Sequence, residues 1–182
     1  MARIPYVDME QLSPEFQPLL KENYSAFRAL AHSPEICSAF RNVVYTLKRT
    51  ELTPRLRELA MLRVGWLSQC RYEWFHHVKT GMENGVSEQD IRILMEDTPA
   101  AYARLDEAAR LTVLATEQMY AGPAASAEVV AALDRLLGTR SLVELLVAMG
   151  FYIGTVRILS SLELDLEPQY EPFLARFPLK NT

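Results

Sequence analysis

The sequence predicts an all-α protein, and three observations support that fold class. Apolar residues recur at helical spacing along most of the 182-residue chain, as expected for amphipathic helices. Glycine is scarce, at 7 residues, whereas strand-rich folds need many tight turns. Serine–proline, threonine–proline and glycine signals separate the apolar segments, as they do at helix ends. Because the connections are short, neighbouring helices should pack antiparallel in a bundle.

These boundary signals divide the chain into a series of expected helices. Proline directly after serine or threonine suits a helix start, because the first helical position has no partner for its N–H in any case. Ser87, with Asp90 three residues later, resembles a capping box. Gly85 and Gly138 suit the position just past a helix end. The expected helices are 13–27, 33–47, 55–84, 88–96, 106–120, 126–137 and 141–162.

The last of these helices, 141–162, is strongly apolar. It carries more apolar surface than one helix of a small monomer usually hides. We therefore expect it in the core or at a subunit interface, and we expect a homo-oligomer. The tail beyond residue 163 contains Pro168, Pro172 and Pro178 and is expected to be irregular. The chain, residues 1–182, has a length that suits a single domain.

Composition and charge argue against several classes of protein. The formal net charge is −4, so the chain lacks the basic surface typical of nucleic-acid binding. No run of about 18 apolar residues predicts a membrane span. The N-terminus carries Asp8 and Glu10 where a signal peptide would be apolar, so we expect a cytoplasmic protein. The two cysteines, Cys37 and Cys70, fit a reducing compartment without a disulfide framework.

The segment 70–77 gathers the residues best suited to chemistry. At about 100° per residue, Cys70, Glu73 and His77 share one helix face, beside the aromatic bulk of Trp66 and Trp74. The carboxyl and imidazole groups lie one turn apart and can hydrogen-bond to each other. An imidazole near a thiol can also take its proton and leave the nucleophilic thiolate. This face therefore predicts proton-transfer or thiol chemistry.

Two other interpretations of the same residues stay open. A glutamate–histidine pair at this spacing is often an ordinary surface pair, and a single cysteine on an apolar face is usually a packing residue. A metal site is weakly indicated, because no HExxH or CxxC motif accompanies Glu73 and His77. No phosphate-binding glycine loop is present either. We expect no cofactor, a packing role for Cys37, and a packing or solvent-facing role for His76.

The chain resembles the carboxymuconolactone decarboxylase/alkylhydroperoxidase-D superfamily. The resemblance rests on residues 52–67, LTPRLRELAMLRVGWL, on residues 70–77, and on Gly85-Val-Ser-Glu. It is strongest over 50–95 and weaker over 142–166. The family resemblance implies an all-α fold, small-molecule substrates and a homo-oligomer, either dimer, trimer or hexamer.

The resemblance also assigns site residues. The peroxidase branch has a glutamate, then CxxC, then a histidine four residues later, which correspond here to Glu58, Cys70 and His77. Glu73 stands where the second cysteine would be, so an intramolecular dithiol cycle is excluded. The decarboxylase branch carries glutamate there and histidine four residues later, as Glu73 and His77 do.

Three functions follow from this mixture. The favoured one is a thiol-dependent peroxidase that uses Cys70 with a Glu58, Glu73 and His77 proton relay and an external thiol reductant. The alternative is an acid–base decarboxylase or lactone-processing enzyme that uses Glu73 and His77. The third is a non-catalytic helical assembly module.

Overall fold

The computed structural model describes residues 2–180, and these residues form helices without a strand. The all-α prediction is therefore confirmed. Three short 3-10 helices accompany the α-helices: η1 Met9–Gln11, η2 Gln17–Leu20 and η3 Pro168–Tyr170. The α-helices are α1 Ser25–Leu30, α2 Pro34–Leu47, α3 Pro54–Ser68, α4 Arg71–Glu83, α5 Glu88–Glu96, α6 Pro99–Tyr102, α7 Glu107–Ala121, α8 Ala127–Leu137, α9 Thr139–Leu162 and α10 Glu171–Arg176.

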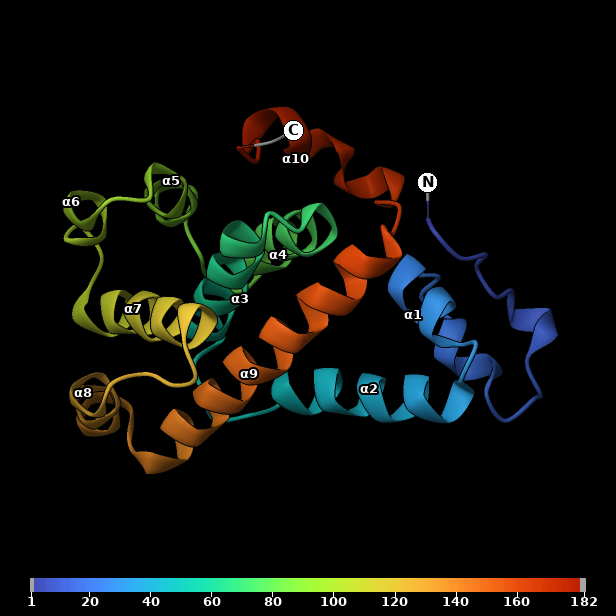
Figure 1. Cartoon of the computed structure of the whole chain (residues 1–182), viewed down its shortest axis with the longest axis horizontal. Helices are drawn as coiled ribbons and strands as arrows, with labels where there is room; N and C mark the ends of the chain where they lie inside the picture. The colour runs from blue at the N-terminus through green and yellow to red at the C-terminus, as the bar shows by residue number, and fades with distance from the viewer. Residues whose placement is uncertain (1, 181–182) are drawn as a thin grey trace.

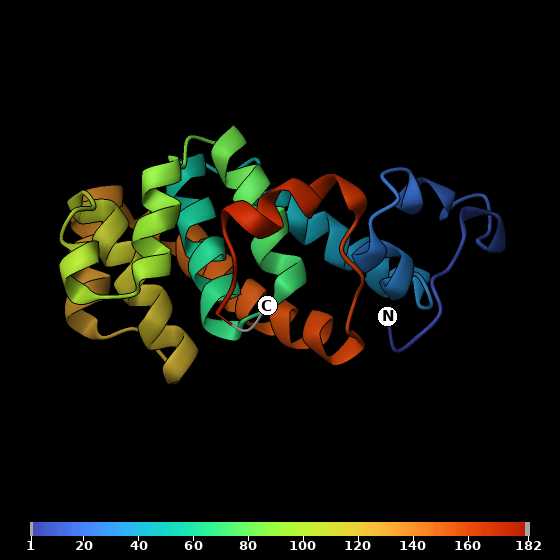
Figure 2. The same ribbon diagram turned by 90° about the horizontal axis from the view of Figure 1, so that it is seen from above.

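The longest helix, α9, runs diagonally across the molecule (Figure 1). On one side it packs against α3, α4, α7 and α8, and α2 lies along its other side. The N-terminal segment and α1 form one end of the elongated molecule, and α7 and α8 form the other (Figure 2). The C-terminal helix α10 returns to α4. Residues from the two ends of the chain thus border the same central helices.

The centre of the main core is α3, in which every residue from Leu56 to Trp66 is buried. Burial on all sides explains why α3 has no polar face, as expected of a helix enclosed by others. A second, smaller apolar cluster holds the N-terminal segment against α1 and α2, and Cys37 is fully buried there. The placement of Cys37 agrees with the packing role expected from the sequence.

Several expected helix boundaries are confirmed by the backbone. Ser87 and Asp90 form the capping box that opens α5, with each side chain accepting from the other residue's N–H. Gly85 and Gly138 have φ angles of 90° and 79°, in the region that favours glycine. Both therefore end helices as predicted, and α2, α7 and α8 fall within a few residues of their expected bounds.

The expected continuous helix 55–84 is wrong, because the chain turns back on itself between α3 and α4. Gln69 adopts a left-handed conformation with φ 51° and ends α3, and Cys70 is the N-cap of α4. The two helices then pack closely at Gly65, where a Cβ would lie 3.1 Å from backbone atoms of Trp74. A side chain at position 65 would force the two helices apart. The turn at Gln69 and Cys70 contains no proline or glycine, so the sequence did not indicate it.

Two further expectations at the chain ends are wrong. The single helix 13–27 is replaced by η2 and α1, because Pro18 lies inside the segment and Asn23 adopts a left-handed φ of 53°. The tail beyond 163 is not irregular throughout, since it forms η3 and α10. Its end is anchored in the core, where Phe177 is fully buried and its carbonyl accepts from Trp74 Nε1 at 2.8 Å.

Helix α9 is long and apolar enough to cross a membrane by length and composition alone. Half of its most apolar stretch is buried inside the structure. Core helices of globular proteins can have the same length and apolar composition. The expectation that this helix contributes to the core is confirmed by Leu145, Ala148 and Met149, which are fully buried.

Candidate active site

His77 lies between two carboxyl groups that come from different helices. Its Nδ1 is 2.7 Å from Glu58 Oε2 on α3, and its Nε2 is 3.1 Å from Glu73 Oε1 on α4. Arg57 completes the row, with its Nε donating to Glu58 Oε1 at 3.0 Å. All four residues are at least nine-tenths buried. The structure thus brings Glu58 into the site, where sequence spacing alone could not place it.

The turn at Gln69 and Cys70 makes this arrangement possible. It folds α4 back along α3, so that residues 19 positions apart, Glu58 and His77, come into contact. Within α4, Glu73 and His77 are one turn apart and face the same side, as their spacing predicts. The Glu73–His77 pair is therefore formed within one helix, whereas Glu58 joins it only because α3 packs against α4.

The two carboxylates determine the charge of the imidazole. Burial alone lowers the pKa of His77, but the negative charges of Glu73 and Glu58 outweigh it and raise that pKa to about 10. Burial opposes ionisation of Glu58, yet the charge and hydrogen bond of His77, with Arg57 behind, lower the pKa of this carboxyl below its ordinary value. His77 is therefore an imidazolium at neutral pH, held from both sides.

Glu73 keeps one hydrogen-bonding site open. Its Oε1 is buried against His77 Nε2 at 3.1 Å, and within residues 2–180 its other carboxylate oxygen has no hydrogen bond. An acceptor without a protein donor is satisfied only when a ligand or water supplies one. This second oxygen of Glu73 is therefore the atom of the site that can accept a proton or a hydrogen bond.

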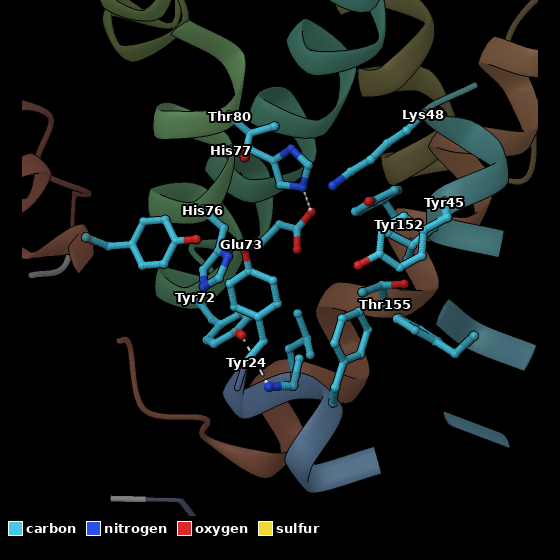
Figure 3. A pocket seen from close by; sticks show the side chains of 16 residues that line it. Tyr24, Tyr45, Lys48, Tyr72, Glu73, His76, His77, Thr80, Tyr152 and Thr155 are labelled. Carbon is cyan, nitrogen blue, oxygen red and sulfur yellow. Dashed lines mark hydrogen bonds and ion pairs between the residues drawn. The ribbon is translucent and has the colours of Figure 1, made fainter. Parts of the chain in front are cut away.

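Glu73 and His77 line a cavity of about 110 Å³. Its walls come from α1, α2, α4, α9 and the C-terminal segment, and Figure 3 places Lys48, the residue after α2, and Tyr152 of α9 across the cavity from α4. The cavity is lined mainly by aromatic and apolar side chains. They include Tyr24, Phe27, Phe40, Val44, Tyr45, Tyr72, Tyr152, Leu159 and Tyr170.

A second histidine–glutamate pair borders the same cavity. His76 Nε2 is 2.6 Å from Glu167 Oε2, and its ring stacks on Tyr72 at 4.2 Å and lies 3.9 Å from that of Tyr170. Burial raises the pKa of Glu167, but the neighbouring His76 outweighs it and lowers that pKa to about 2. The carboxylate also accepts from the backbone N–H of Ser25. His76 is therefore packed and paired, not solvent-facing.

Cys70 is buried but does not line this cavity. Its neighbourhood is a separate, more polar cavity of about 440 Å³, bordered also by Ser160 and Arg71. Burial raises the pKa of the Cys70 thiol, although contacts with Ser160 and nearby backbone groups oppose that effect. The thiol is thus protonated at neutral pH. The sequence placed Cys70 on one face with Glu73 and His77, whereas the structure gives it a different cavity.

Several residues of the cavity were not identified from the sequence. Lys48 and Tyr152 line the cavity from the end of α2 and from α9, and Glu167 of the C-terminal segment pairs with the cavity residue His76. No motif near these residues marks a site. Only the number of tyrosines, 8 in the chain, hinted at an aromatic pocket. Within the described residues, no cluster of three or more histidine, cysteine or acidic side chains is arranged to hold a metal ion.

Comparison by sequence finds one family model and no curated protein. The model of the carboxymuconolactone decarboxylase family matches residues 33–118, a segment that contains the signature region 50–95 and the Glu58, Glu73 and His77 cluster. No curated protein matches the chain.

Solved structures with the same fold have distant sequences. A protein of unknown function from Agrobacterium tumefaciens, with a suggested role as the antioxidant defence protein AhpD, is 23% identical, with a TM-score of 0.64 over 75% of this chain and 93% of its own. The debrominase Bmp8, as a cysteine-to-alanine variant bound to 2,3,4-tribromopyrrole, is 13% identical, with a TM-score of 0.76 over 97% of this chain and 100% of its own. Unliganded Bmp8 is 14% identical, with a TM-score of 0.73 over 94% of this chain and 96% of its own. At these identities the likeness establishes the fold.

Proposed function

This chain belongs to the carboxymuconolactone decarboxylase family, and from that premise we propose that it is an enzyme that transfers protons on a small, ring-sized substrate. The observation that supports the proposal is the Glu58–His77–Glu73 cluster at the wall of the aromatic cavity. Glu73 is the group that meets the substrate, because it lines the cavity and the carboxylate oxygen that does not face His77 has no hydrogen bond within residues 2–180. Both nitrogens of His77 already face carboxylates.

The roles within the cluster follow from its charges. Glu73 accepts a proton from the substrate, and His77 stabilises the Glu73 carboxylate before the transfer. After the transfer the Glu73 carboxyl group returns the same proton to another atom of the substrate, and His77, 3.1 Å away, again stabilises the carboxylate that forms. Glu58 is a positioning residue that fixes the ring orientation of His77 through Nδ1. Such a relay suits reactions that pass through an enolate, decarboxylation and lactone processing among them.

The size of the substrate is limited by the cavity. An engineered cavity of about 150 Å³ holds one benzene molecule, and the cavity of this chain measures about 110 Å³. Bmp8, which has this fold, binds the single-ring compound 2,3,4-tribromopyrrole. We therefore propose substrates of about one ring.

Proton transfer can be measured without knowing the natural substrate. We would incubate the protein in D₂O with a panel of small β-keto acids, lactones and ring ketones, and follow deuterium incorporation by NMR. Glu73→Gln and His77→Gln are expected to lower the rate by at least 100-fold, the usual contribution of a general acid or base. Lys79→Ala, an exposed change on the same helix, is the control. Wild-type rates in either site variant contradict the proposal.

A second candidate function is thiol peroxidase activity of Cys70. It is favoured by one observation, that the thiol borders the polar cavity of about 440 Å³, through which a hydroperoxide can reach sulfur. The raised pKa of Cys70 opposes it, because the thiolate is the nucleophile. An external thiol would have to reduce the sulfenic acid, since Cys37 is buried in the other apolar cluster.

The thiol reaction has a direct test. The reduced protein is mixed with an organic hydroperoxide, and sulfenic acid is trapped and located by mass spectrometry. Peroxidase activity requires fast modification at Cys70 that Cys70→Ser removes and Cys37→Ser preserves. We expect slow modification, from the raised pKa of the thiol, and this result would leave the acid–base function as the better account.

The homo-oligomer stays a prediction. Helix α9 presents Val143, Val147 and Ile158 with 52%, 51% and 43% of their surface exposed, more than isolated apolar residues at a surface require. Light scattering coupled to size-exclusion chromatography measures the mass. A monomer at micromolar concentration would contradict this prediction.

A further inference from the structure

The cavity is bordered by two polar groups of opposite hydrogen-bonding character. Glu73 turns its Oε1 to His77, and within residues 2–180 its other carboxylate oxygen, an acceptor, has no hydrogen bond. The Tyr152 hydroxyl is a donor that lines the same cavity and forms no hydrogen bond in the same part of the chain. Polar groups inside proteins are nearly always paired with protein or water. An acceptor and a donor that both lack a protein partner in one cavity therefore indicate a ligand that pairs with both.

Tyr152 is held in place by its ring and leaves its hydroxyl free for that purpose. The ring meets the His77 ring edge-on, with centroids 5.2 Å apart and planes at 90°, and only 8% of the residue is exposed. Burial and the negative charges of Glu73 and Glu58 raise the pKa of Tyr152 well above its ordinary value. The hydroxyl thus keeps its proton and remains a donor. It borders the same cavity as Glu73.

Lys48 adds a positive charge at the mouth of the cavity. Figure 3 shows its side chain reaching from α2 toward the centre of the cavity. In the described part of the chain it forms no ion pair, and its Nζ lies 5.5 Å from the centroid of the Tyr45 ring. The charges of Arg57, Glu58, His77 and Glu73 balance one another. Lys48 therefore leaves the cavity with a net positive charge, suited to an oxygen that becomes negative.

We propose that the cavity binds a single-ring phenol or ring enol, with Tyr152 as a catalytic residue that donates a hydrogen bond to the substrate oxygen. A hydroxyl on an sp² carbon satisfies both unpaired groups with one oxygen, since its O–H donates to Glu73 and its lone pair accepts from Tyr152. The aromatic walls of the cavity provide stacking partners for the ring. This inference names the substrate class of the proposed proton-transfer function and rests on it.

The proton and charge balance of the step is complete within these residues. The ligand hydroxyl gives its proton to the Glu73 carboxylate and keeps the electron pair on oxygen. The resulting oxyanion accepts from the Tyr152 hydroxyl, as in sites that stabilise enolates with preorganised donors, and Lys48 supplies the counter-charge. No oxidant, reductant or further reactant is needed. Return of the proton to carbon instead of oxygen gives the keto form of the same ring.

Ligand binding tests this inference separately from turnover. We would titrate the protein with 4-fluorophenol and, as a matched ligand without the hydroxyl, fluorobenzene, and follow both by ¹⁹F NMR. Tyr152→Phe keeps the ring and removes only the donor. It is expected to weaken 4-fluorophenol about tenfold and to leave fluorobenzene unchanged. Fluorobenzene binding thus shows that the variant is folded. The matched control is Tyr120→Phe, a half-buried tyrosine outside the cavity, which should change neither affinity.

The contribution of the Lys48 charge to binding is tested separately. Lys48→Gln is expected to weaken the ionised ligand 2,6-difluorophenolate about fivefold, as for a partly exposed charge pair, and to leave fluorobenzene unchanged. Equal affinity of the wild-type protein for 4-fluorophenol and fluorobenzene, or unchanged 4-fluorophenol binding by Tyr152→Phe, would overturn the inference. If the hydroxyl-dependent binding holds and deuterium exchange fails, the proposed function fails and the assigned ligand class stands. If deuterium exchange is observed and the hydroxyl-dependent binding is not, the proposed function stands and the assigned ligand class fails.

Discussion

His76 and His77 are neighbours in sequence, and their surroundings have almost nothing in common. His77 is enclosed in the core by carboxyl groups of α3 and α4, with 11% of its side chain exposed. His76 lies among Tyr24, Tyr72 and Tyr170 and pairs with Glu167, which comes from the C-terminal segment. Adjacent positions on a helix point about 100° apart. That rotation is enough to give one histidine two charges and the other an aromatic enclosure.

The different surroundings of the two histidines indicate different roles, a chemical role for His77 and a structural role for His76. Both nitrogens of His77 face carboxylates, and Glu73 lines the cavity. His76 instead joins segments distant in sequence, because its partner Glu167 also accepts from the N–H of Ser25 and from the Tyr72 hydroxyl. The first pair is positioned to move protons. The second holds both ends of the chain over the cavity.

The largest expected effect comes from removing the charge of His77. His77→Gln leaves Glu58 and Glu73 buried without the cation between them, and the free energy of unfolding should fall by about 3–5 kcal/mol, as for a broken buried ion pair. Urea unfolding followed by circular dichroism measures it. A loss below about 1 kcal/mol would mean that the two carboxylates do not depend on His77.

The pH dependence of stability should follow the same residue. The pKa of His77 is raised from 6.5 to about 10 on folding, so its contribution is complete below pH 6.5 and is lost as the pH rises toward 10. The free energy of unfolding should therefore decline with pH across this window in the wild-type protein. His77→Gln should show a flatter profile, whereas His76→Gln should keep the wild-type slope. Parallel profiles for the wild type and His77→Gln contradict the raised pKa.

The second pair is expected to contribute less. Glu167→Gln removes a charge-assisted contact and should lower the free energy of unfolding by about 1–3 kcal/mol. It should also increase amide hydrogen exchange in the segment 164–176 more than in α3, since the pair anchors this segment. Mass spectrometry of exchanged peptides measures both regions. Uniform acceleration in the two regions would mean that Glu167 supports the whole core.

The smallest change in the free energy of unfolding is expected for an exposed ion pair, which serves as the reference for both histidine pairs. Lys79 and Glu83 form an exposed pair on the same helix at 2.6 Å, and Lys79→Ala should change the free energy of unfolding by about 0.3–0.5 kcal/mol. An effect as large as that of Glu167→Gln would show that burial does not distinguish these pairs. The same urea titration as for His77→Gln supplies the value.

Much of the helical order was readable from the sequence because its causes are local. The capping box at Ser87, the glycines at 85 and 138 and the proline at the start of α2 fixed helix ends within a few residues. The expected helix 55–84 failed for the opposite reason. Its interruption at Gln69 is a left-handed turn of a residue without strong turn preference, stabilised by the packing of α3 on α4.

In the candidate site, too, local contacts were predictable from the sequence and contacts between distant helices were not. The sequence by itself determined the Glu73–His77 pair, since residues one helical turn apart must share a face, and the family motif pointed to Glu58. Only the tertiary structure decided that Glu58 reaches His77, that Cys70 borders a different cavity, and that Tyr152 and Lys48 face Glu73. These relations depend on how helices distant in sequence pack together, and no local spacing encodes that packing.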